Sequence, residues 1–152
     1  MVNSGKERQR IVVVCYGNIC RSPTAEALLK RALQRAGLER RFLVRSAGVG
    51  AQPGTPAARG AVEAAQAHHL DLSAHRARRL TAEMAHEADV LIALDEVVEE
   101  EIAILAGDLE VLLWPVDDPY GGSDADYRRA FTAIEGLVED YVTELRTRTT
   151  AR

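Results

Sequence analysis

The chain has 152 residues, of which 47% are hydrophobic and 28% are charged, and its formal net charge at pH 7 is −4. This composition is typical of one folded domain with its own core, and it excludes a disordered chain. The negative charge argues against a nucleic-acid partner, and the lack of a long apolar stretch argues against a membrane partner or a secretory signal.

Alternating strands and helices are predicted along the whole chain. Short aliphatic runs indicate four strands, at residues 11–15, 42–45, 90–94 and 111–114. Apolar spacing and capping signals indicate helices at residues 23–36, 55–69, 81–87, 96–105 and 124–146. Gly37 and Gly107 are the expected helix stops, and Thr55 is the expected N-cap of the second helix. Residues 1–9 and 147–152 are predicted to be tails that flank one domain, residues 10–146.

The predicted strands read as continuous apolar runs, which is typical of a parallel sheet covered by helices on both faces. The predicted fold class is therefore α/β, a single domain with a four-stranded, parallel, twisted and doubly wound sheet. In such sheets ligands bind beyond the carboxyl ends of the strands, where the strand order switches. Cys15 ends the first strand and Asp118 follows the fourth, so we expect both at the same edge.

The segment between the first strand and the first helix, residues 15–22, reads Cys-Tyr-Gly-Asn-Ile-Cys-Arg-Ser. Pro23 suits the first turn of the helix that follows. A loop in this place points backbone N–H groups at one spot, and the helix dipole adds positive potential, so we expect it to bind phosphate or another oxyanion. The expected amide donors are those of Tyr16, Gly17, Asn18, Ile19 and Cys20. Gly17 and Asn18 are suited to the left-handed backbone that a tight anion nest requires.

Cys15 and Arg21 stand near the two ends of this predicted cradle. Cys15 is the candidate nucleophile, because a thiolate attacks phosphorus where a thiol attacks poorly. Arg21 is expected to hold two phosphoryl oxygens with its planar guanidinium. Ser22 is expected to hydrogen-bond the Cys15 thiolate, to cap the first helix, or to do both.

Both cysteines of the chain, Cys15 and Cys20, lie in this loop. Two cysteines at this spacing do not suit a structural disulfide framework, so a reducing, cytoplasmic location is expected. They also lack the partners of a zinc site, and no metal or other cofactor is expected. Cys20 has two open interpretations: a small apolar filler of the loop, or one half of a reversible disulfide that protects Cys15 from over-oxidation.

Five short segments together resemble one protein family. They are Val-Cys-Tyr-Gly-Asn-Ile-Cys-Arg-Ser-Pro at 14–23, Ser-Ala-Gly at 46–48, His-Arg-Ala-Arg at 75–78, Ala-Leu-Asp at 93–95 and Asp-Pro-Tyr at 118–120. In this combination the chain resembles the low-molecular-weight protein tyrosine phosphatases over residues 10–146. The resemblance implies the phosphotyrosine phosphatase I-like form of the fold, and a hydrolase that cleaves phosphotyrosine through a cysteinyl-phosphate intermediate. Its partners would be phosphorylated proteins, and the enzyme would be a monomer.

The resemblance also implies roles outside the loop. Asp118 would be the general acid that protonates the leaving oxygen, although Asp117 stands next to it. Tyr120 would wall the substrate cleft. Family members commonly carry an aromatic residue in the loop that corresponds to residues 49–54, and this chain has none there, which predicts a flatter cleft.

Three further side chains are expected to support the loop rather than to touch substrate. By the same resemblance, Asn18, Ser46 and His75 would form a hydrogen-bond network that holds the loop in its shape. A buried loop of this kind needs such partners for its polar groups.

Three alternatives to a tyrosine phosphatase stay open. The ending Asp-Pro-Tyr-Gly-Gly-Ser at 118–123 is similar to the protein arginine phosphatases, whereas Ile19 favours an aromatic ring above the phosphate site. An arsenate reductase of this fold would need further cysteines for a thiol relay. A non-catalytic phosphate-binding module would have no need of Asp118.

Overall fold

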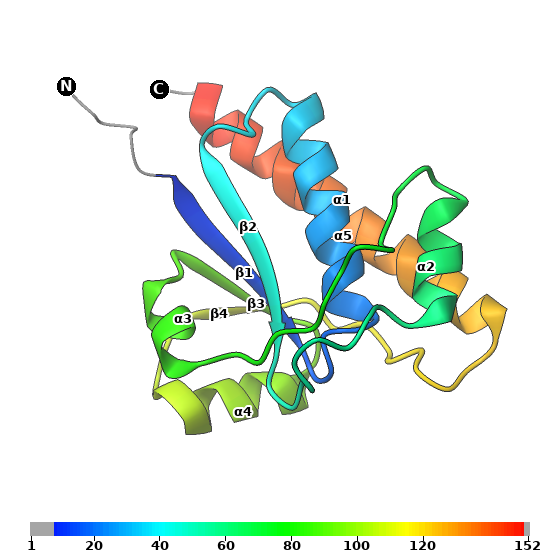
Figure 1. Cartoon of the computed structure of the whole chain (residues 1–152). Coiled ribbons are helices and arrows are strands. Elements are labelled where there is room, and N and C mark those ends of the chain that lie inside the picture. The colour runs from blue at the N-terminus through cyan, green and yellow to red at the C-terminus, as the bar shows by residue number, and fades with distance from the viewer. Residues whose placement is uncertain (1–7, 151–152) are drawn as a thin grey trace.

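The structure is a computed structural model that describes residues 8–150 (Figure 1). Its elements in chain order are β1 (Gln9–Cys15), α1 (Arg21–Arg35), β2 (Phe42–Gly48), α2 (Arg59–Gln66), α3 (Ala82–Glu87), β3 (Val90–Ala93), α4 (Glu96–Ala106), β4 (Val111–Leu113) and α5 (Asp124–Thr150). Within the described residues, no helix combines the length and the apolar character that crossing a bilayer requires.

One parallel sheet contains β1 to β4, in the order β2-β1-β3-β4. β1 pairs with β2 from Gln9 opposite Phe42 to Cys15 opposite Gly48, and it pairs with β3 on its other side. The order of the strands therefore switches direction at β1, and the loop after β1 leaves the sheet at this switch point. The predicted α/β fold with a four-stranded parallel sheet is confirmed.

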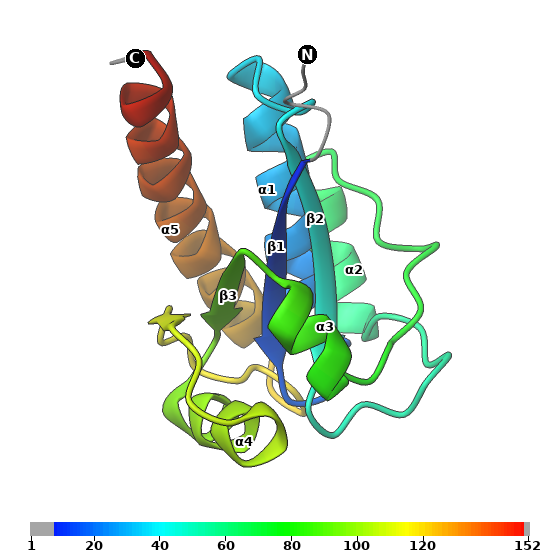
Figure 2. The same cartoon turned by 90° about the vertical axis from the view of Figure 1, so that its left-hand side faces the viewer.

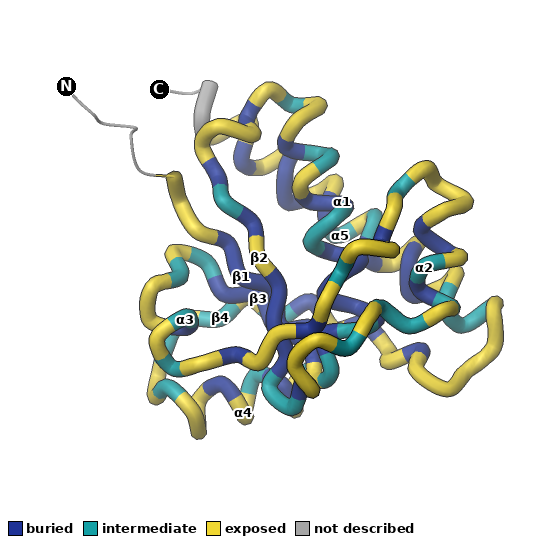
Figure 3. The backbone as a smooth tube through the Cα atoms, viewed as in Figure 1, coloured by how far each residue is buried: buried dark blue, intermediate teal, exposed yellow. Residues whose placement is uncertain are grey.

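The side chains of β1 alternate between two cores, one on each face of the sheet. Ile11 and Val13 pack with α1, α2 and α5, whereas Val12 and Val14 pack with α3 and α4. Figures 1 and 2 show the two helix layers on opposite sides of the strands, and Figure 3 shows the buried central strand. Because residues 11–14 of β1 are buried on both faces, they form an unbroken aliphatic run, whereas Gln9 and Arg10 at the start of the strand are exposed.

Helix α1 begins directly at the loop that follows β1. Cys20 is its N-cap residue without a side-chain cap, and Arg21 is its first residue, so the helix starts two residues earlier than expected. The alternative role of Ser22 as N-cap is therefore wrong. After α1, Gly37 has a φ of 75°, which only glycine adopts without strain, and this residue stops the helix as predicted.

Helix α2 begins at Arg59, four residues after the predicted start, and Thr55 is not its N-cap. The Thr55 hydroxyl instead donates to the carbonyl of Gln52 at 2.8 Å. Residues 55–58 are held in an extended form, because Pro56 forms a β-bridge with Arg76. This pairing was not visible in the sequence, since it joins two loops.

The ends of two elements also differ from expectation. β2 continues to Gly48, three residues further than predicted, and α5 continues to Thr150 rather than to residue 146. The predicted C-terminal tail is therefore helical up to Thr150. Residues 1–7 of the predicted N-terminal tail lie outside the described residues, and Gln9 already belongs to β1.

Candidate active site

A pocket of about 140 Å³ opens at the carboxyl end of β1. It is lined by Cys15, Tyr16, Gly17, Ile19, Cys20, Arg21, Asp118 and Tyr120. The loop after β1 thus meets the segment after β4, as the sheet topology predicts. The candidate nucleophile, the arginine and the candidate acid surround one small space.

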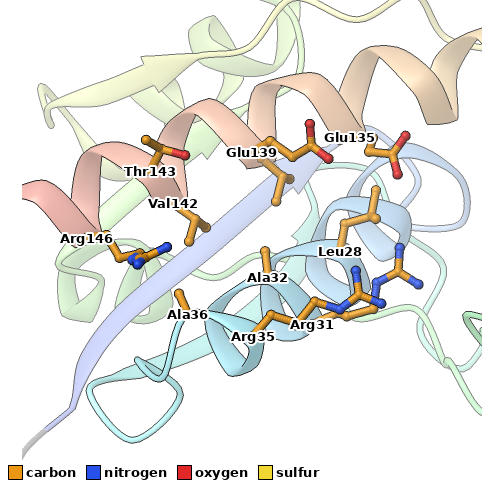
Figure 4. Close-up of a pocket in the computed structure, with 11 residues that line it drawn as sticks. Leu28, Arg31, Ala32, Arg35, Ala36, Glu135, Glu139, Val142, Thr143 and Arg146 are labelled. Atoms are coloured by element: carbon orange, nitrogen blue, oxygen red, sulfur yellow. The ribbon is translucent and has the colours of Figure 1, made fainter.

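A second hollow of about 230 Å³ lies between α1 and α5 (Figure 4). Arg31 and Arg35 reach it from α1, and Glu135 and Glu139 reach it from α5. Its lining includes neither cysteine and no residue of the loop after β1. The chemistry therefore belongs to the smaller pocket.

The backbone of the loop curls around the sulfur of Cys15. The N–H of Asn18 donates to Cys15 Sγ at 3.2 Å, and Asn18 is the loop residue with a left-handed φ, of 57°. Gly17 was also expected in that region, but its φ is not positive. The curl thus brings a backbone amide donor to the thiol, and a contact of this kind stabilises an anion.

Cys15 itself is 2% exposed and lies close to one hydroxyl. Its Sγ is 2.9 Å from Ser22 Oγ, and the hydroxyl of Ser22 also reaches the carbonyl of Ala47 at 3.5 Å. Ser22 is fully buried in the first turn of α1, so its side chain is fixed there. The predicted contact between the hydroxyl and the thiol is present.

Asn18 is the centre of the network that supports the loop. Its side-chain N–H groups donate to Ser22 Oγ at 2.8 Å and to Ser46 Oγ at 3.0 Å. Its Oδ1 accepts from the backbone N–H of Arg78 at 2.8 Å. Its carbonyl accepts from His75 Nε2 at 2.7 Å, so that ring nitrogen carries a proton. The structure therefore brings Asn18, Ser46 and His75 together.

The network continues to a residue that the sequence analysis did not single out. Ser46 Oγ donates to Glu26 Oε1 at 2.5 Å, and Glu26 also pairs with Lys30 at 2.7 Å on the same helix. Glu26 follows the loop motif by one helical turn, a spacing that places it beside β2. Because the Ser46 hydroxyl donates its proton to this carboxylate, the lone pairs of Ser46 Oγ face Asn18 and accept from its side-chain amide.

The last residue of β2, Gly48, lies against the loop. A Cβ atom at this position would be 2.5 Å from the carbonyl oxygen of Tyr16 and 2.9 Å from the backbone nitrogen of Asn18. These are backbone atoms that cannot swing aside. The glycine of the Ser-Ala-Gly segment therefore permits close packing of two backbones, and this is its physical role.

Arg21 is a buried cation, 3% exposed, held mainly through one nitrogen. Its Nη1 donates to Asp95 Oδ2 at 2.8 Å, to the carbonyl of Val116 at 2.9 Å and to that of Leu94 at 3.4 Å. Its Nη2 lies 3.7 Å from Asp118 Oδ2. Its Nε is buried without a partner among the described residues. The edge formed by Nε and Nη2 is therefore available for a bidentate anion.

Asp95 orients Arg21, a role that was not predicted from the sequence. Its Oδ1 accepts from the N–H of Val98 at 2.8 Å and so caps α4, while its Oδ2 binds the guanidinium. Burial opposes the charge of Asp95, but the Val98 N–H and the Arg21 guanidinium outweigh this effect and hold the pKa of the carboxyl below its usual value. The available signal was its position directly after β3, at the same sheet edge as Cys15.

Asp118 lies at the mouth of the pocket with its side chain half-exposed, and its Oδ1 accepts from the N–H of Tyr120 at 3.1 Å. Tyr120 is 67% exposed and lines the same pocket. Asp117 does not line it. Asp118 and Asp117 therefore differ in position, since only Asp118 reaches the pocket. From the sequence, the two carboxylates differ only in that Asp118 begins the Asp-Pro-Tyr segment.

Cys20 differs from Cys15 in its surroundings. Burial raises the pKa of the Cys20 thiol to about 12, although the hydroxyl of Tyr127, 3.9 Å from its sulfur, acts in the opposite direction. Such a thiol stays protonated at neutral pH and is a poor nucleophile. Both cysteines are free, and Cys20 fills space at the start of α1. The alternative of a reversible disulfide with Cys15 stays a prediction.

The described residues contain no group of three or more His, Cys, Asp or Glu side chains that could hold a metal ion. The positive charge of the pocket comes from Arg21 and from backbone amides. A cysteine in an oxyanion loop, a buried arginine and a carboxylate at the mouth together define a site of the cysteine-dependent phosphatase class.

Comparison with known proteins identifies the family within this class. The family model of low molecular weight phosphotyrosine protein phosphatases matches residues 10–151. A probable low molecular weight protein-tyrosine-phosphatase, EpsP of Ralstonia solanacearum, is 36% identical over 146 residues, which are 90% of this chain and 95% of that protein. The chain therefore belongs to the low molecular weight phosphotyrosine protein phosphatase family.

Two further relatives differ in the substrates that their names give. The protein-arginine-phosphatase of Bacillus subtilis is 35% identical over 147 residues, which are 90% of this chain and 96% of that protein. A crystal structure of the tyrosine phosphatase Wzb from Escherichia coli K30, in complex with sulphate, has a TM-score of 0.83 and 29% identity. That match covers 91% of this chain and 99% of Wzb.

Proposed function

We propose that the protein hydrolyses phosphotyrosine in phosphorylated proteins through a cysteinyl-phosphate intermediate. The observation that carries this proposal is the placement of Cys15, Arg21 and Asp118 around one pocket, with Arg21 Nη2 3.7 Å from Asp118 Oδ2. A phosphoryl group held by the arginine would thus have the thiol on one side and the carboxyl group on the other. In-line displacement at phosphorus requires this arrangement.

In the first step, Cys15 Sγ as thiolate forms a bond to phosphorus while the bond from phosphorus to the phenolic oxygen breaks. The departing oxygen takes a proton from the Asp118 carboxyl group, so tyrosine leaves as a neutral phenol. Ser22 Oγ, 2.9 Å from Sγ, stabilises the thiolate before attack. In the second step Asp118 accepts a proton from water, which attacks phosphorus and releases inorganic phosphate and the thiolate.

Arg21 and the loop amides bind the phosphoryl oxygens throughout. The Nε and Nη2 edge of Arg21 offers two parallel donors, and the amides of residues 16–20 supply the remaining ones. These donors are fixed before the reaction, because Asp95 holds the guanidinium and Asn18 holds the loop. No cofactor takes part in these steps.

Hydrolysis of phosphoarginine in proteins is the second candidate. Two observations favour it: the 35% identity to the Bacillus subtilis protein-arginine-phosphatase, and the Asp-Pro-Tyr-Gly-Gly-Ser segment at 118–123. Ile19 lines the pocket and offers an apolar surface to the substrate, which favours an aryl group. An arsenate reductase fits less well, because Cys20 is the only thiol besides Cys15. A non-catalytic phosphate-binding module would not need Asp118.

Two finer points belong to the same proposal. Phosphoproteins are the proposed partners of a monomeric enzyme that binds neither nucleic acid nor membrane, in line with the net charge of −4. A cytoplasmic location is proposed because both cysteines are free and unpaired cysteines suit a reducing compartment.

The test measures phosphate release from a phosphotyrosine peptide and from a phosphoarginine protein, without added metal. The variants are Cys15→Ser, Asp118→Asn and, as a matched control, Asp117→Asn. We expect a preference for phosphotyrosine, complete loss in Cys15→Ser, a decrease of about 10²–10⁴-fold in Asp118→Asn, and little change in Asp117→Asn. A preference for phosphoarginine would establish the second candidate, and full activity of Cys15→Ser would exclude both.

A further inference from the structure

The side chain of Tyr16 has no role in the mechanism above, which uses only its backbone amide. Tyr16 is nevertheless 55% exposed, and it lines the pocket beside Cys15. A large apolar ring at this exposure, next to a phosphate site, is a candidate contact for the part of the substrate that carries the phosphate.

The ring lies on the backbone of Gly50. A Cβ atom at Gly50 would be 2.5 Å from Tyr16 Cζ, 2.7 Å from Cε2 and 2.8 Å from Oη. Gly50 does not have a left-handed φ, so the backbone conformation alone does not require glycine there. Instead, the Tyr16 ring occupies the space that a side chain at position 50 would need.

Backbone hydrogen bonds hold the two segments in this arrangement. The N–H of Gly50 donates to the carbonyl of Tyr16 at 2.9 Å, and the N–H of Val49 donates to the carbonyl of Cys15 at 3.1 Å. The ring and the surface under it are therefore parts of one joined unit. The Cζ, Cε2 and Oη end of the ring therefore lies against Gly50, and the exposed part of Tyr16 is left for a ligand.

We propose that Tyr16, seated on Gly50, is a specificity-determining residue that binds the aromatic ring of an aryl phosphate at the pocket mouth. Tyr120, which lines the same pocket from the segment after β4, supplies a second aromatic surface. The segment 49–54 carries no aromatic side chain of its own, and the small residue at position 50 is what admits the ring of Tyr16. The flatter cleft expected from that segment alone stays a prediction; under this proposal the aromatic wall comes from the phosphate loop instead.

This inference rests on the proposed function but can be tested without turnover. Two competitive ligands are compared by calorimetry, phenylphosphonate and methylphosphonate, which share the anion and differ in the ring. Their affinity ratio reports the ring contact alone. A seated aromatic contact predicts that Tyr16→Leu lowers this ratio roughly two- to tenfold, while Tyr16→Phe preserves it.

Gly50→Ala is the sharper variant, because it leaves Tyr16 in place and displaces its ring. The new methyl group meets only the far end of a mobile side chain, so the fold is kept and the ring must swing away. We expect Gly50→Ala to lower the same ratio by a similar factor, and to have no further effect in the Tyr16→Leu background.

Three results would overturn the proposal: an unchanged ratio in Tyr16→Leu, equal losses for both phosphonates, or a full effect of Gly50→Ala in the Tyr16→Leu background. Activity is then measured separately on a phosphotyrosine peptide. An altered ratio in a protein that hydrolyses no phosphotyrosine would uphold the role of Tyr16 and reject the proposed function, so the two failures are distinguishable.

Discussion

Arg21 carries its charge inside the protein, with the Asp95 carboxylate at 2.8 Å as its near partner and the more exposed Asp118 carboxylate at 3.7 Å. Breaking a buried ion pair by removing one partner costs more than a surface pair is worth, because the remaining charge is left in a poor solvent. Asp95 is about one-third exposed, so water screens part of this interaction. The pair therefore stabilises the fold moderately, and its larger effect is to fix the direction of the guanidinium.

Asp95→Asn should separate the charge of this residue from its capping role, since asparagine is also a good N-cap. We expect a loss of about 1–2 kcal/mol in the free energy of unfolding and a weaker affinity for phosphate. Because the pKa of Asp95 is lowered in the folded state, the stability it adds is complete above its unfolded pKa of about 3.9 and is lost as pH falls through the folded value. The difference between wild type and variant should therefore be constant from about pH 5 to 8 and shrink below about pH 4.

Urea unfolding at several pH values measures this difference. The matched control is Thr81→Ala, which removes the N-cap of α3, where Thr81 Oγ1 accepts from the N–H of Met84 at 3.1 Å. Its cost should be about 1 kcal/mol, with phosphate affinity unchanged. Equal phosphate affinities for Asp95→Asn and wild type would contradict the orienting role.

The chemistry of single residues was predictable where a local motif carries it. Cys15, Arg21 and Ser22 stand in one continuous loop, so residue type and spacing were enough to propose their roles. Asp95 and Glu26 were missed because each acts through a contact with a distant segment, and sequence spacing does not report such contacts.

At the scale of elements, the end of β2 and the phosphate loop form one closely packed unit. Two glycines permit this packing. Gly48 leaves room for the backbone of the loop, and Gly50 leaves room for the side chain of Tyr16. The phosphate loop thus depends on the neighbouring strand β2 for its shape, and a small change in that strand should shift the position of Cys15.

Gly48→Ala should therefore damage both stability and activity. The new Cβ would meet backbone atoms at 2.5 and 2.9 Å, so we expect a cost of about 1–3 kcal/mol and a large loss of phosphatase activity. Gly136→Ala is the matched control, because Gly136 lies at an exposed position in the middle of α5, where a Cβ meets nothing within 4 Å. It should stabilise the protein by about 0.5–1 kcal/mol and leave activity intact. Thermal unfolding and an activity assay are measured for both variants. The critical result is that Gly48→Ala lowers the stability while Gly136→Ala raises it.

The type and order of the elements were predictable because apolar periodicity is a local signal. Boundaries failed where pairing between distant segments decides them. β2 extends to Gly48 because it pairs with the whole of β1, and α2 starts late because Pro56 pairs with Arg76. Local signals such as the Thr55-Pro56 start cannot anticipate these pairings.

For the whole molecule, oxyanion binding should be coupled to global stability, since the loop and the start of α1 are hydrogen-bonded to β2 through Ser46 and to the N-cap of α4 through Asp95. Inorganic phosphate at about 100 times its dissociation constant should stabilise the native state by about 2.7 kcal/mol, or roughly 5–10 °C in Tm. Arg21→Lys keeps the charge but not the planar fork, so it should lose most of this shift. Chloride at equal ionic strength is the control. The same shift with chloride, or in the variant, would show that phosphate acts outside the pocket.

The packing of α1 against α5 joins the first helix of the chain to the last, with Leu29 and Leu33 in the same core as Ile134 and Val138. During synthesis the loop that carries Cys15 leaves the ribosome before Asp118 and before α5, the helix that covers α1. A nascent chain therefore exposes Cys15 long before it can assemble the site. The site is therefore complete only after Asp118 and α5 have joined the part of the fold that holds Cys15.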